Sequence, residues 1–352
     1  MDSEASELLT VIIPFLNEGE EVKNTLRSIR EHGGWQVAVL LINDGSNGGY
    51  PYEEYAGEYG VSYFFNPERQ GVARCWDMGV EMCRTPWFLL LDAHMWFYQE
   101  DWIQILVGEL QKDEWVLLCC NTRILRKNEQ GEMYDASGEN KTFGARVHFG
   151  RDGDMLGAKW VAAERKPGEE VEDIGCVLGA GYGGSKRYWQ YLRGLEGGRC
   201  RLLKNLYIGH YYRPKAPYRI ASSFVLYNKL LIAYLLLPLY MQVRVYVALQ
   251  QEYTPKLFKA EFSHLMEKKE EWEALKKYYR QIFTRSFEEA VEVNRKQENR
   301  VQGNQVLLDK VFREVLLNCN RTDDLGIEKG RIGSILFWRL MFIKERIKQE
   351  RN

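Results

Sequence analysis

The sequence predicts an α/β fold in the N-terminal half of the chain and a mainly helical C-terminal region. Short apolar runs rich in β-branched residues alternate with segments of helical spacing, which is typical of a parallel sheet covered on both faces. Beyond Pro214 the chain changes to longer helical patterns, many of them strongly charged. We therefore expect one domain at residues 1–215 and a helical region at residues 216–352.

Four apolar runs are predicted as strands, with helices between them. The predicted strands are 8–14, 37–42, 61–65 and 88–91. Val22, Leu26 and Ile29 share one face of a helix after the first strand, and another helix is expected through Met78 and Met82. Four such repeats form a doubly wound, Rossmann-like sheet, in which ligands bind at the carboxyl ends of the strands.

The clearest chemical signal is the pair Asp92 and His94, which follows the fourth predicted strand. Because alternate residues of an extended chain point the same way, we expect an oxygen and a nitrogen ligand to face one ion. The alternative is a strand end at which Asp92 begins a turn and His94 packs nearby. Asp44 follows the second strand, so both carboxylates are expected at one edge of the sheet.

The composition argues against some classes of partner and site. The chain has 48 basic and 49 acidic residues, and nothing indicates the clustered basic surface that nucleic-acid binding requires, so we expect no nucleic-acid partner. Seven cysteines include no C-x-x-C pair, and Cys119 and Cys120 are expected to be small buried residues rather than zinc ligands. The acidic residues 1–7 do not have the pattern of a signal peptide, which favours a cytoplasmic location.

Four segments, taken in order, carry a resemblance to a known family. They are Thr-Val-Ile-Ile-Pro-Phe-Leu-Asn-Glu at 10–18, Asn-Asp-Gly-Ser at 43–46, Gly-Val-Ala-Arg at 71–74 and Leu-Asp-Ala-His at 91–94. Together they resemble the nucleotide-sugar half of a GT-A glycosyltransferase of the family 2 type. The metal motif is similar to the Asp-X-His motif of polypeptide N-acetylgalactosaminyltransferases, and the resemblance extends over residues 8–214.

This resemblance implies a binding site for a nucleotide-sugar donor. It implies that Asp44 contacts the uracil and the ribose, and that Arg74 helps to hold the nucleotide. Pro14, Asn17 and Glu18 of the first segment are expected to line the same site. The alternatives are that Asp44 only forms a turn and that Arg74 is a solvated arginine in a first helical turn.

The resemblance also implies a metal site. Asp92, which is also an expected catalytic residue, and His94 would bind Mn²⁺ or Mg²⁺ at the diphosphate of a UDP-sugar. A cation there stabilises the charge that develops on the leaving diphosphate, and mixed oxygen and nitrogen ligands suit manganese better than calcium. Residues 206–213 resemble the glycine-histidine-aromatic-arginine segment that supplies a second histidine, so His210 is expected as the third ligand. Taken alone, His210 would be a structural histidine.

A glycine-rich segment at 176–186 allows two interpretations. Gly179, Gly181 and Gly184 match the pattern G-x-G-x-x-G, which by itself would suggest a dinucleotide fold. The segment follows the four β-α repeats instead of lying in the first one, so we discount that fold. In the glycosyltransferase interpretation these glycines, Gly181 among them, let the backbone lie close to the donor sugar.

The acceptor side is less clear in the sequence. Residues 126–170 are polar and glycine-rich, so we expect an irregular substrate loop, in which His148 and Trp160 either contact an acceptor sugar or pack internally. After Glu196 the chain runs directly into Gly197, where the family normally has a longer acidic and leucine-rich segment. Either the natural protein lacks this segment or the sequence omits it. We favour an omission, which leaves Glu196 as the candidate catalytic carboxylate within the chain.

The C-terminal region is expected to be helical throughout. Residues 228–238 are strongly apolar but too short to span a bilayer, which needs ~20 residues. Another helical face is formed by Trp272, Leu275, Tyr279, Ile282 and Phe283. The aromatic and basic segment 335–344 would rest on an anionic membrane, on its own domain or on a partner chain.

Together these features predict a metal-dependent glycosyltransferase that moves a hexosyl or N-acetylhexosaminyl group from a UDP-sugar to a hydroxyl of a glycan, lipid-linked or protein acceptor. One alternative is a sugar-phosphate nucleotidyltransferase, but residues 14–18 lack the glycine-rich basic loop of that class. The other is a non-catalytic protein that binds nucleotide sugars or serves in assembly. The expected location is cytoplasmic, with peripheral contact to the inner face of the membrane through the C-terminal helix. Retention or inversion at the sugar is not specified by these residues.

Overall fold

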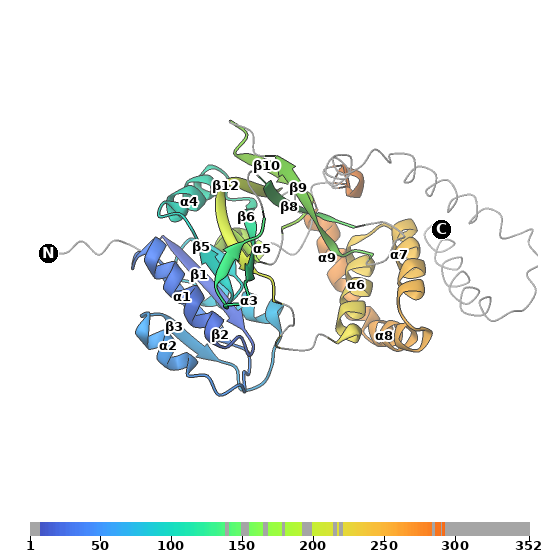
Figure 1. Cartoon of the computed structure of the whole chain (residues 1–352). Coiled ribbons are helices and arrows are strands. Elements are labelled where there is room, and N and C mark those ends of the chain that lie inside the picture. Colours follow the sequence, from blue (N-terminus) through green and yellow to red (C-terminus); the bar gives the residue numbers. More distant parts are fainter. Residues whose placement is uncertain are drawn as a thin grey trace, which may run out of the picture. The chain divides into compact units, whose positions relative to one another are not determined.

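The computed structural model describes most of the chain up to residue 292 (Figure 1). The described residues are 8–137, 141–148, 155–164, 168–177, 180–191, 199–213, 217, 221–283, 286–289 and 291–292. The chain divides into two compact units, Met1–Gln302 and Gly303–Asn352, and every described residue lies in the first. The expected boundary at residue 215 stays a prediction.

The four strands predicted for the N-terminal half are present. They are β1 (Leu9–Phe15), β2 (Ala38–Asn43), β3 (Ser62–Phe65) and β4 (Trp87–Leu91), and they pair in parallel in the order β3-β2-β1-β4. Val11, Ile12 and Ile13 are fully buried, so side chains on both faces of β1 are covered. A strand covered on both faces needs a continuous apolar run, which explains why the sequence marks these strands clearly.

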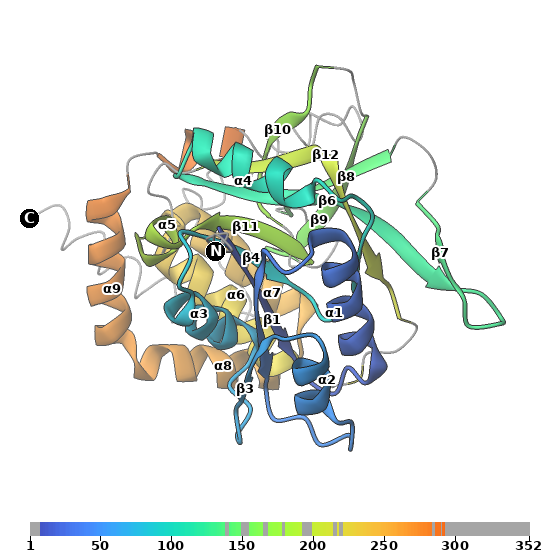
Figure 2. The ribbon, with the colours of Figure 1, turned by 90° about the vertical axis from the view of Figure 1, so that its left-hand side faces the viewer.

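Helices cover both faces of this parallel part of the sheet (Figure 2). Side chains of α1 (Glu20–Gly33), α2 (Tyr52–Glu58) and α4 (Trp102–Lys112) pack with Leu9, Val11 and Ile13 on one face. Side chains of α3 (Val72–Met82) and α5 (Lys186–Tyr191) pack with Ile12 on the other. The alternation of neighbouring β1 residues between two core clusters is the two-residue period of a strand, and it confirms the expected doubly covered sheet.

Beyond β4 the sheet becomes mixed. It continues through β11 (Gly181–Ser185), β6 (Val116–Lys127), β12 (Arg199–Tyr211) and β10 (Val171–Ile174), giving the order β10-β12-β6-β11-β4-β1-β2-β3. β11 is antiparallel to both β4 and β6, whereas β12 is parallel to β6. The strands β4, β6 and β12 therefore run in the same direction, and their carboxyl ends lie toward the same edge of the sheet.

The glycine-rich segment forms the inserted strand β11. A Cβ at Gly183 would lie 2.8 Å from the backbone oxygen of Phe88, and one at Gly184 would lie 2.9 Å from the Leu117 side chain. The backbone oxygen of Phe88 cannot move aside, so Gly183 is needed for close strand packing, whereas at Gly184 the end of the Leu117 side chain would have to shift. Gly181 is less crowded, since its Cβ would have no neighbour nearer than 3.6 Å.

The expectation of an irregular loop at residues 126–170 is wrong where this stretch forms strands. β7 (Met133–Asp135) pairs with β6, and β8 (Lys141–Val147) and β9 (Ala158–Glu164) form a separate two-stranded antiparallel sheet. An antiparallel pair can bury a single face, so its strands lack the long apolar run that marks a buried parallel strand. The polar composition of the segment therefore concealed its strands.

The junction near Glu196 is a short connection in this chain. α5 ends at Tyr191 and β12 begins at Arg199, and the sequence runs continuously between them. The expectation that a segment was omitted after Glu196 stays a prediction. Glu196 itself lies outside the described residues.

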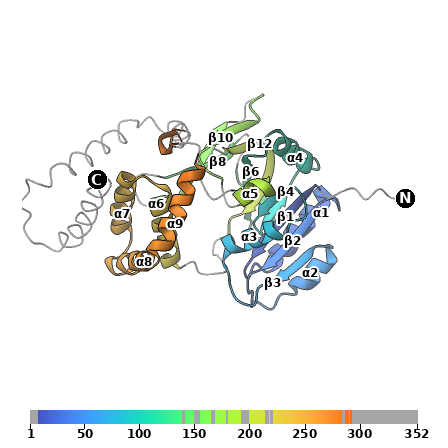
Figure 3. The same ribbon diagram turned by 180° about the vertical axis from the view of Figure 1, so that it is seen from behind.

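Four helices follow the sheet domain and pack on one another (Figure 3). They are α6 (Ser222–Leu236), α7 (Leu239–Glu252), α8 (Pro255–Glu267) and α9 (Lys269–Ile282). Pro238 separates α6 from α7, and Thr254 caps α8 by accepting a hydrogen bond from the Leu257 amide. The expected helices at 228–238 and around Trp272 are confirmed, while 335–344 lies outside the described residues. Within the described part of the chain, every helix is too short or too polar to cross a bilayer.

Candidate metal and donor site

Asp92 and His94 lie in the connection between β4 and β5 (Met95–Phe97). The expectation of an extended chain at this point is wrong, because Ala93 and His94 form a turn. The turn still brings the side chains together, with Nε2 of His94 4.0 Å from Oδ2 of Asp92. Helix α1 fixes the start of β5, since Thr25 Oγ1 accepts a hydrogen bond from the Met95 amide at 3.0 Å.

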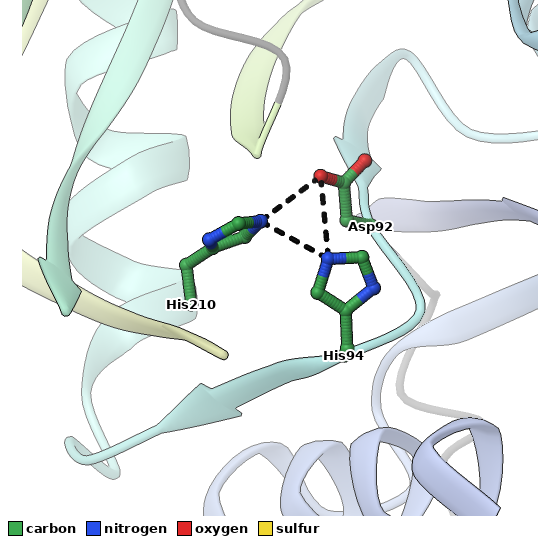
Figure 4. Close-up of side chains that lie close together, drawn as sticks. All are labelled: Asp92, His94 and His210. Atoms are coloured by element: carbon green, nitrogen blue, oxygen red, sulfur yellow. Dashed lines mark hydrogen bonds and ion pairs between the residues drawn. The ribbon is translucent and has the colours of Figure 1, made fainter. Parts of the chain in front are cut away.

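His210 reaches the same place through strand pairing. β12 pairs with β5 in antiparallel register, with His210 opposite Met95, and the Tyr211 amide donates to the carbonyl of His94 at 3.1 Å. Nε2 of His210 lies 3.4 Å from Oδ2 of Asp92 and 3.0 Å from Nε2 of His94 (Figure 4). One ligand atom from each of the three residues lies within 4.8 Å of the others. The structure therefore brings together the three residues predicted as metal ligands.

The chemistry of this trio fits a divalent cation. One carboxylate and two imidazoles form a mixed oxygen and nitrogen set, which suits manganese and other first-row metals. The side chains are partly accessible, with exposed fractions of 29% for Asp92, 9% for His94 and 13% for His210. Burial lowers the pKa of His210, although the neighbouring Asp92 carboxylate partly opposes this effect. A neutral imidazole keeps the lone pair that a metal ligand needs.

Glu18 is buried beside the predicted metal ligand His94. Its side chain is only 4% exposed, and its carboxylate accepts hydrogen bonds from both terminal nitrogens of Arg213, one of them at 3.1 Å. Oε2 of Glu18 also lies 3.2 Å from Nδ1 of His94. Glu18 thus lies behind a predicted metal ligand, with its oxygens directed at Arg213 and His94.

The loops after β1 and β2 are bonded to each other at the expected nucleotide site. The Asn17 amide donates to Oγ of Ser46 and the Asn47 amide donates to Oδ1 of Asn17, both at 2.8 Å. Asn17 has a φ of 56°, a left-handed conformation that asparagine tolerates better than most residues. Pro14 is buried within β1, opposite Ile42 of β2. Pro14 and Asn17 therefore shape this edge from the sheet and the loop, respectively.

Asp44 is buried and holds the loop that precedes α3. Its Oδ1 accepts from the Gln70 amide at 2.7 Å and from Nδ2 of Asn66 at 3.1 Å, and its Oδ2 accepts from the Gly71 amide at 2.8 Å. Gly71 precedes α3 directly, and the exposed Arg74 lies in the first turn of that helix. Asp44 therefore fixes the start of the helix that carries Arg74, a connection that the sequence pattern did not indicate.

The remaining candidate residues, Gly181, His148 and Trp160, lie in different places. Gly181 pairs with Leu91 at the end of β4, and the neighbouring Ala180 carbonyl accepts from the Asp92 amide at 3.2 Å, which places Gly181 beside the trio. His148 is buried, and its main chain bonds to Leu156 and Gly157, which favours the packing interpretation. The side chain of Trp160 lies outside the described residues.

Sequence reasoning missed the pairing of Glu18 with Arg213. The two residues are 195 positions apart, so no local pattern connects them. The one available signal was the arginine that follows His210 in the segment 206–213. A buried carboxylate near a metal ligand is expected to need a cationic partner, and this arginine supplies it.

Comparison with known proteins gives a family-model match over part of the chain and a similar fold. Residues 10–156 match the family model described as glycosyl transferase family 2, whereas no curated protein sequence matches the chain. A crystal structure of GalNAc-T7 with UDP, GalNAc and Mn²⁺ is similar over 65% of this chain and 48% of its own, with a TM-score of 0.53 and 19% identity. The chain thus spans about half the length of that protein.

A weaker likeness is found with a mannosyltransferase of Pyrobaculum calidifontis, PcManGT, in complex with GDP-Man and Mn²⁺. It has a TM-score of 0.42 and 11% identity, and covers 89% of this chain and 80% of its own. The family match includes all four motif segments with Asp92 and His94, while His210 lies beyond it. Residues 10–156 thus match the glycosyl transferase family 2 model, and they lie within a sheet domain that has the GT-A fold.

Proposed function

We propose that this protein is a metal-dependent glycosyltransferase that moves a sugar from a UDP-sugar to an acceptor hydroxyl. The observation that carries the proposal is the trio Asp92, His94 and His210, whose ligand atoms meet at the carboxyl end of β4. Ligands of open α/β sheets bind at this edge. The GalNAc-T7 structure, which contains UDP and Mn²⁺, supports this choice of donor and metal.

The proposed chemistry divides between the metal ligands and the nucleotide loops. Asp92, His94 and His210 would hold Mn²⁺ or Mg²⁺, and a cation so held stabilises the negative charge that forms on the leaving diphosphate. Asp92 thereby serves catalysis as well as metal binding. Arg74, exposed in the first turn of α3, supplies a second positive charge for the nucleotide.

The residues around the metal ligands are proposed to bind the nucleotide and the sugar. Asp44 and Asn17 hold the loops after β2 and β1 in place through the bonds described above, and Pro14 shapes the same edge. The backbone of Gly181, beside Asp92, is proposed to lie close to the hexosyl or N-acetylhexosaminyl group. Glu18 belongs to this site through His94.

On the acceptor side we propose Glu196 as the carboxylate that would activate a hydroxyl of a glycan, lipid-linked or protein acceptor. We assign residues 1–215 to catalysis and residues 216–352 to a helical region. The segment 335–344, which is aromatic and basic, is proposed to contact an anionic membrane surface or a second copy of the chain, on the cytoplasmic side.

The test is donor hydrolysis and transfer, measured with a panel of UDP-hexoses and UDP-N-acetylhexosamines, with Mn²⁺ and with a chelator. We expect one donor to be turned over only when the metal is present. Metal-dependent UDP binding without turnover of any donor would favour the non-catalytic alternative, which rests on the short connection at Glu196. Turnover that is unchanged by the chelator would contradict the metal assignment.

A further inference from the structure

We infer that Glu18 is a positioning residue for the metal site: it fixes the ring orientation of His94 and the nitrogen that carries its proton. The inference rests on the proposed metal site and adds a residue to it. Nδ1 of His94 is buried and has no aligned hydrogen-bond partner within the described part of the chain. Oε2 of Glu18 nevertheless lies only 3.2 Å from it.

The direction of this contact decides the state of the ring. An ionised carboxylate only accepts hydrogen bonds, so its attraction to His94 is favourable when the proton is on Nδ1. Nε2 of His94 then keeps its lone pair, and this atom faces Asp92 and His210. A small rotation of the ring would align the Nδ1 proton with Oε2. A carboxylate behind a ligating histidine commonly sets its orientation and raises its basicity in this way.

Arg213 compensates for the burial of the Glu18 carboxylate. Removing a carboxylate from water carries a large cost in free energy unless a charge and hydrogen bonds compensate for it. The two terminal nitrogens of Arg213 provide both. The pair Glu18 and Arg213 is neutral overall, so the negative charge that faces the metal position comes from Asp92.

A purely structural role for Glu18 would account for the bonds to Arg213, and the experiment must separate the two roles. The test variant is Glu18→Gln, which keeps the size of the side chain and removes its charge. The matched control is Glu172→Gln, because Glu172 of β10 is also nearly buried, with an exposed fraction of 10%, and is paired with the buried Lys204 at 2.9 Å. Both variants lose the charge of a buried glutamate in an ion pair.

The measurements are the Mn²⁺ dissociation constant in the presence of UDP, from the electron paramagnetic resonance signal of free Mn²⁺, and the visible spectrum of bound Co²⁺. We expect Glu18→Gln to weaken Mn²⁺ binding by about 10- to 100-fold, the usual effect of losing such a partner, and to change the Co²⁺ spectrum. Glu18→Asp should recover part of the affinity. Glu172→Gln should bind both metals as the wild type does, even if it unfolds at a lower temperature.

Equal dissociation constants for the wild type, Glu18→Gln and Glu172→Gln would overturn the inference while leaving the metal site intact. Failure of the wild type itself to bind Mn²⁺ would instead refute the proposed metal-dependent function. If Glu18→Gln does not fold, the inference is tested on the wild type. Nuclear magnetic resonance of chelator-treated protein labelled with ¹⁵N-histidine shows which ring nitrogen of His94 carries the proton, and the inference requires this proton on Nδ1. A proton on Nε2 would overturn it.

Discussion

The carboxylate of Glu18 and the guanidinium of Arg213 form a buried ion pair between the loop after β1 and the residues that follow β12. The exposed fractions of the two side chains are 4% and 16%. The pair joins points that are 195 residues apart in the sequence. It therefore connects the loop of the expected nucleotide site to the strand that supplies His210.

Replacing Arg213 with methionine should destabilise the fold, because it leaves the Glu18 carboxylate buried without a cation. Breaking one side of a buried ion pair typically costs about 3–5 kcal/mol. The measurement is the free energy of unfolding from urea titration. Arg187→Met is the control, since Arg187 pairs with Glu114 at the surface and is 64% exposed. Similar small losses in both variants would show that the Glu18 ion pair contributes little.

Replacing Asp92 with asparagine should remove the anionic metal ligand with little effect on folding, because the Asp92 side chain is 29% exposed. We expect Mn²⁺-dependent sugar transfer to fall by roughly 100-fold or more, as the cation supplies several kcal/mol of charge stabilisation. Activity is measured with the donor found in the panel, and folding is checked by circular dichroism. Asp135→Asn, in a carboxylate that pairs with Arg123 on β6, is the control. Unchanged activity in Asp92→Asn would refute its role as a ligand.

Replacing Asp44 with alanine should loosen the loop that starts α3. The partly buried amides of Gln70 and Gly71 lose their acceptor, and a hydrogen bond to a charged group contributes about 1.5–3 kcal/mol. Urea unfolding measures this loss, and calorimetry measures UDP binding to the folded fraction. A weaker UDP affinity at full folding would support nucleotide contact by Asp44 or by the Arg74 that its loop positions. Normal affinity would leave Asp44 with a structural role alone.

Alanine at Gly183 should be far more disruptive than alanine at Gly181. The added Cβ at Gly183 would lie 2.8 Å from a backbone oxygen, which cannot move aside as a side-chain end can, and overpacking of this kind costs about 1–3 kcal/mol. At Gly181 the nearest atoms are 3.6 Å away, so the fold should be retained. Thermal unfolding tests both variants. Reduced donor binding in a stable Gly181→Ala protein would support its place beside the sugar.

The buried thiol of Cys75 and the half-buried thiols of Cys176 and Cys200 should react slowly in the native protein. Burial raises the pKa of Cys75 and Cys176 to about 12 and that of Cys200 to about 11, above the ordinary value of about 8.5. At pH 8 almost no thiolate is present, and the reaction should accelerate only as the pH approaches these values. The measurement is the rate at which a disulfide reagent labels the Cys319→Ser variant at different pH values, with and without denaturant. Rapid labelling of native protein at pH 8 would contradict the burial.

The parallel strands could be predicted because burial on both faces leaves a plain apolar signature. Leu9 to Phe15 and Trp87 to Leu91 are of this kind. Strand β12 begins Arg-Cys-Arg and contains Lys204, so only its end at His210 was recognised, and through a motif. Helix α2 was missed because its buried face consists of Tyr52, Tyr55 and Ala56, two of which carry polar hydroxyls.

The metal trio could be predicted because two short motifs identify its members. The roles of Glu18 and Asp44 could not, since each depends on contacts made after folding. Glu18 meets a residue far along the chain, and Asp44 binds main-chain amides that have no sequence signature. Motifs thus located the candidate residues, while the bonds that hold those residues required the structure.

The strand order also has a consequence for the synthesis of this protein. The strands β3, β2, β1 and β4 are neighbours and can pair as soon as they emerge from the ribosome, but β6 reaches β4 only through β11, which is made later. Until residue 185 is added, both β4 and β6 expose an unpaired edge, a state prone to aggregation. A fragment that ends at residue 156, where the family match ends, would be trapped in that state.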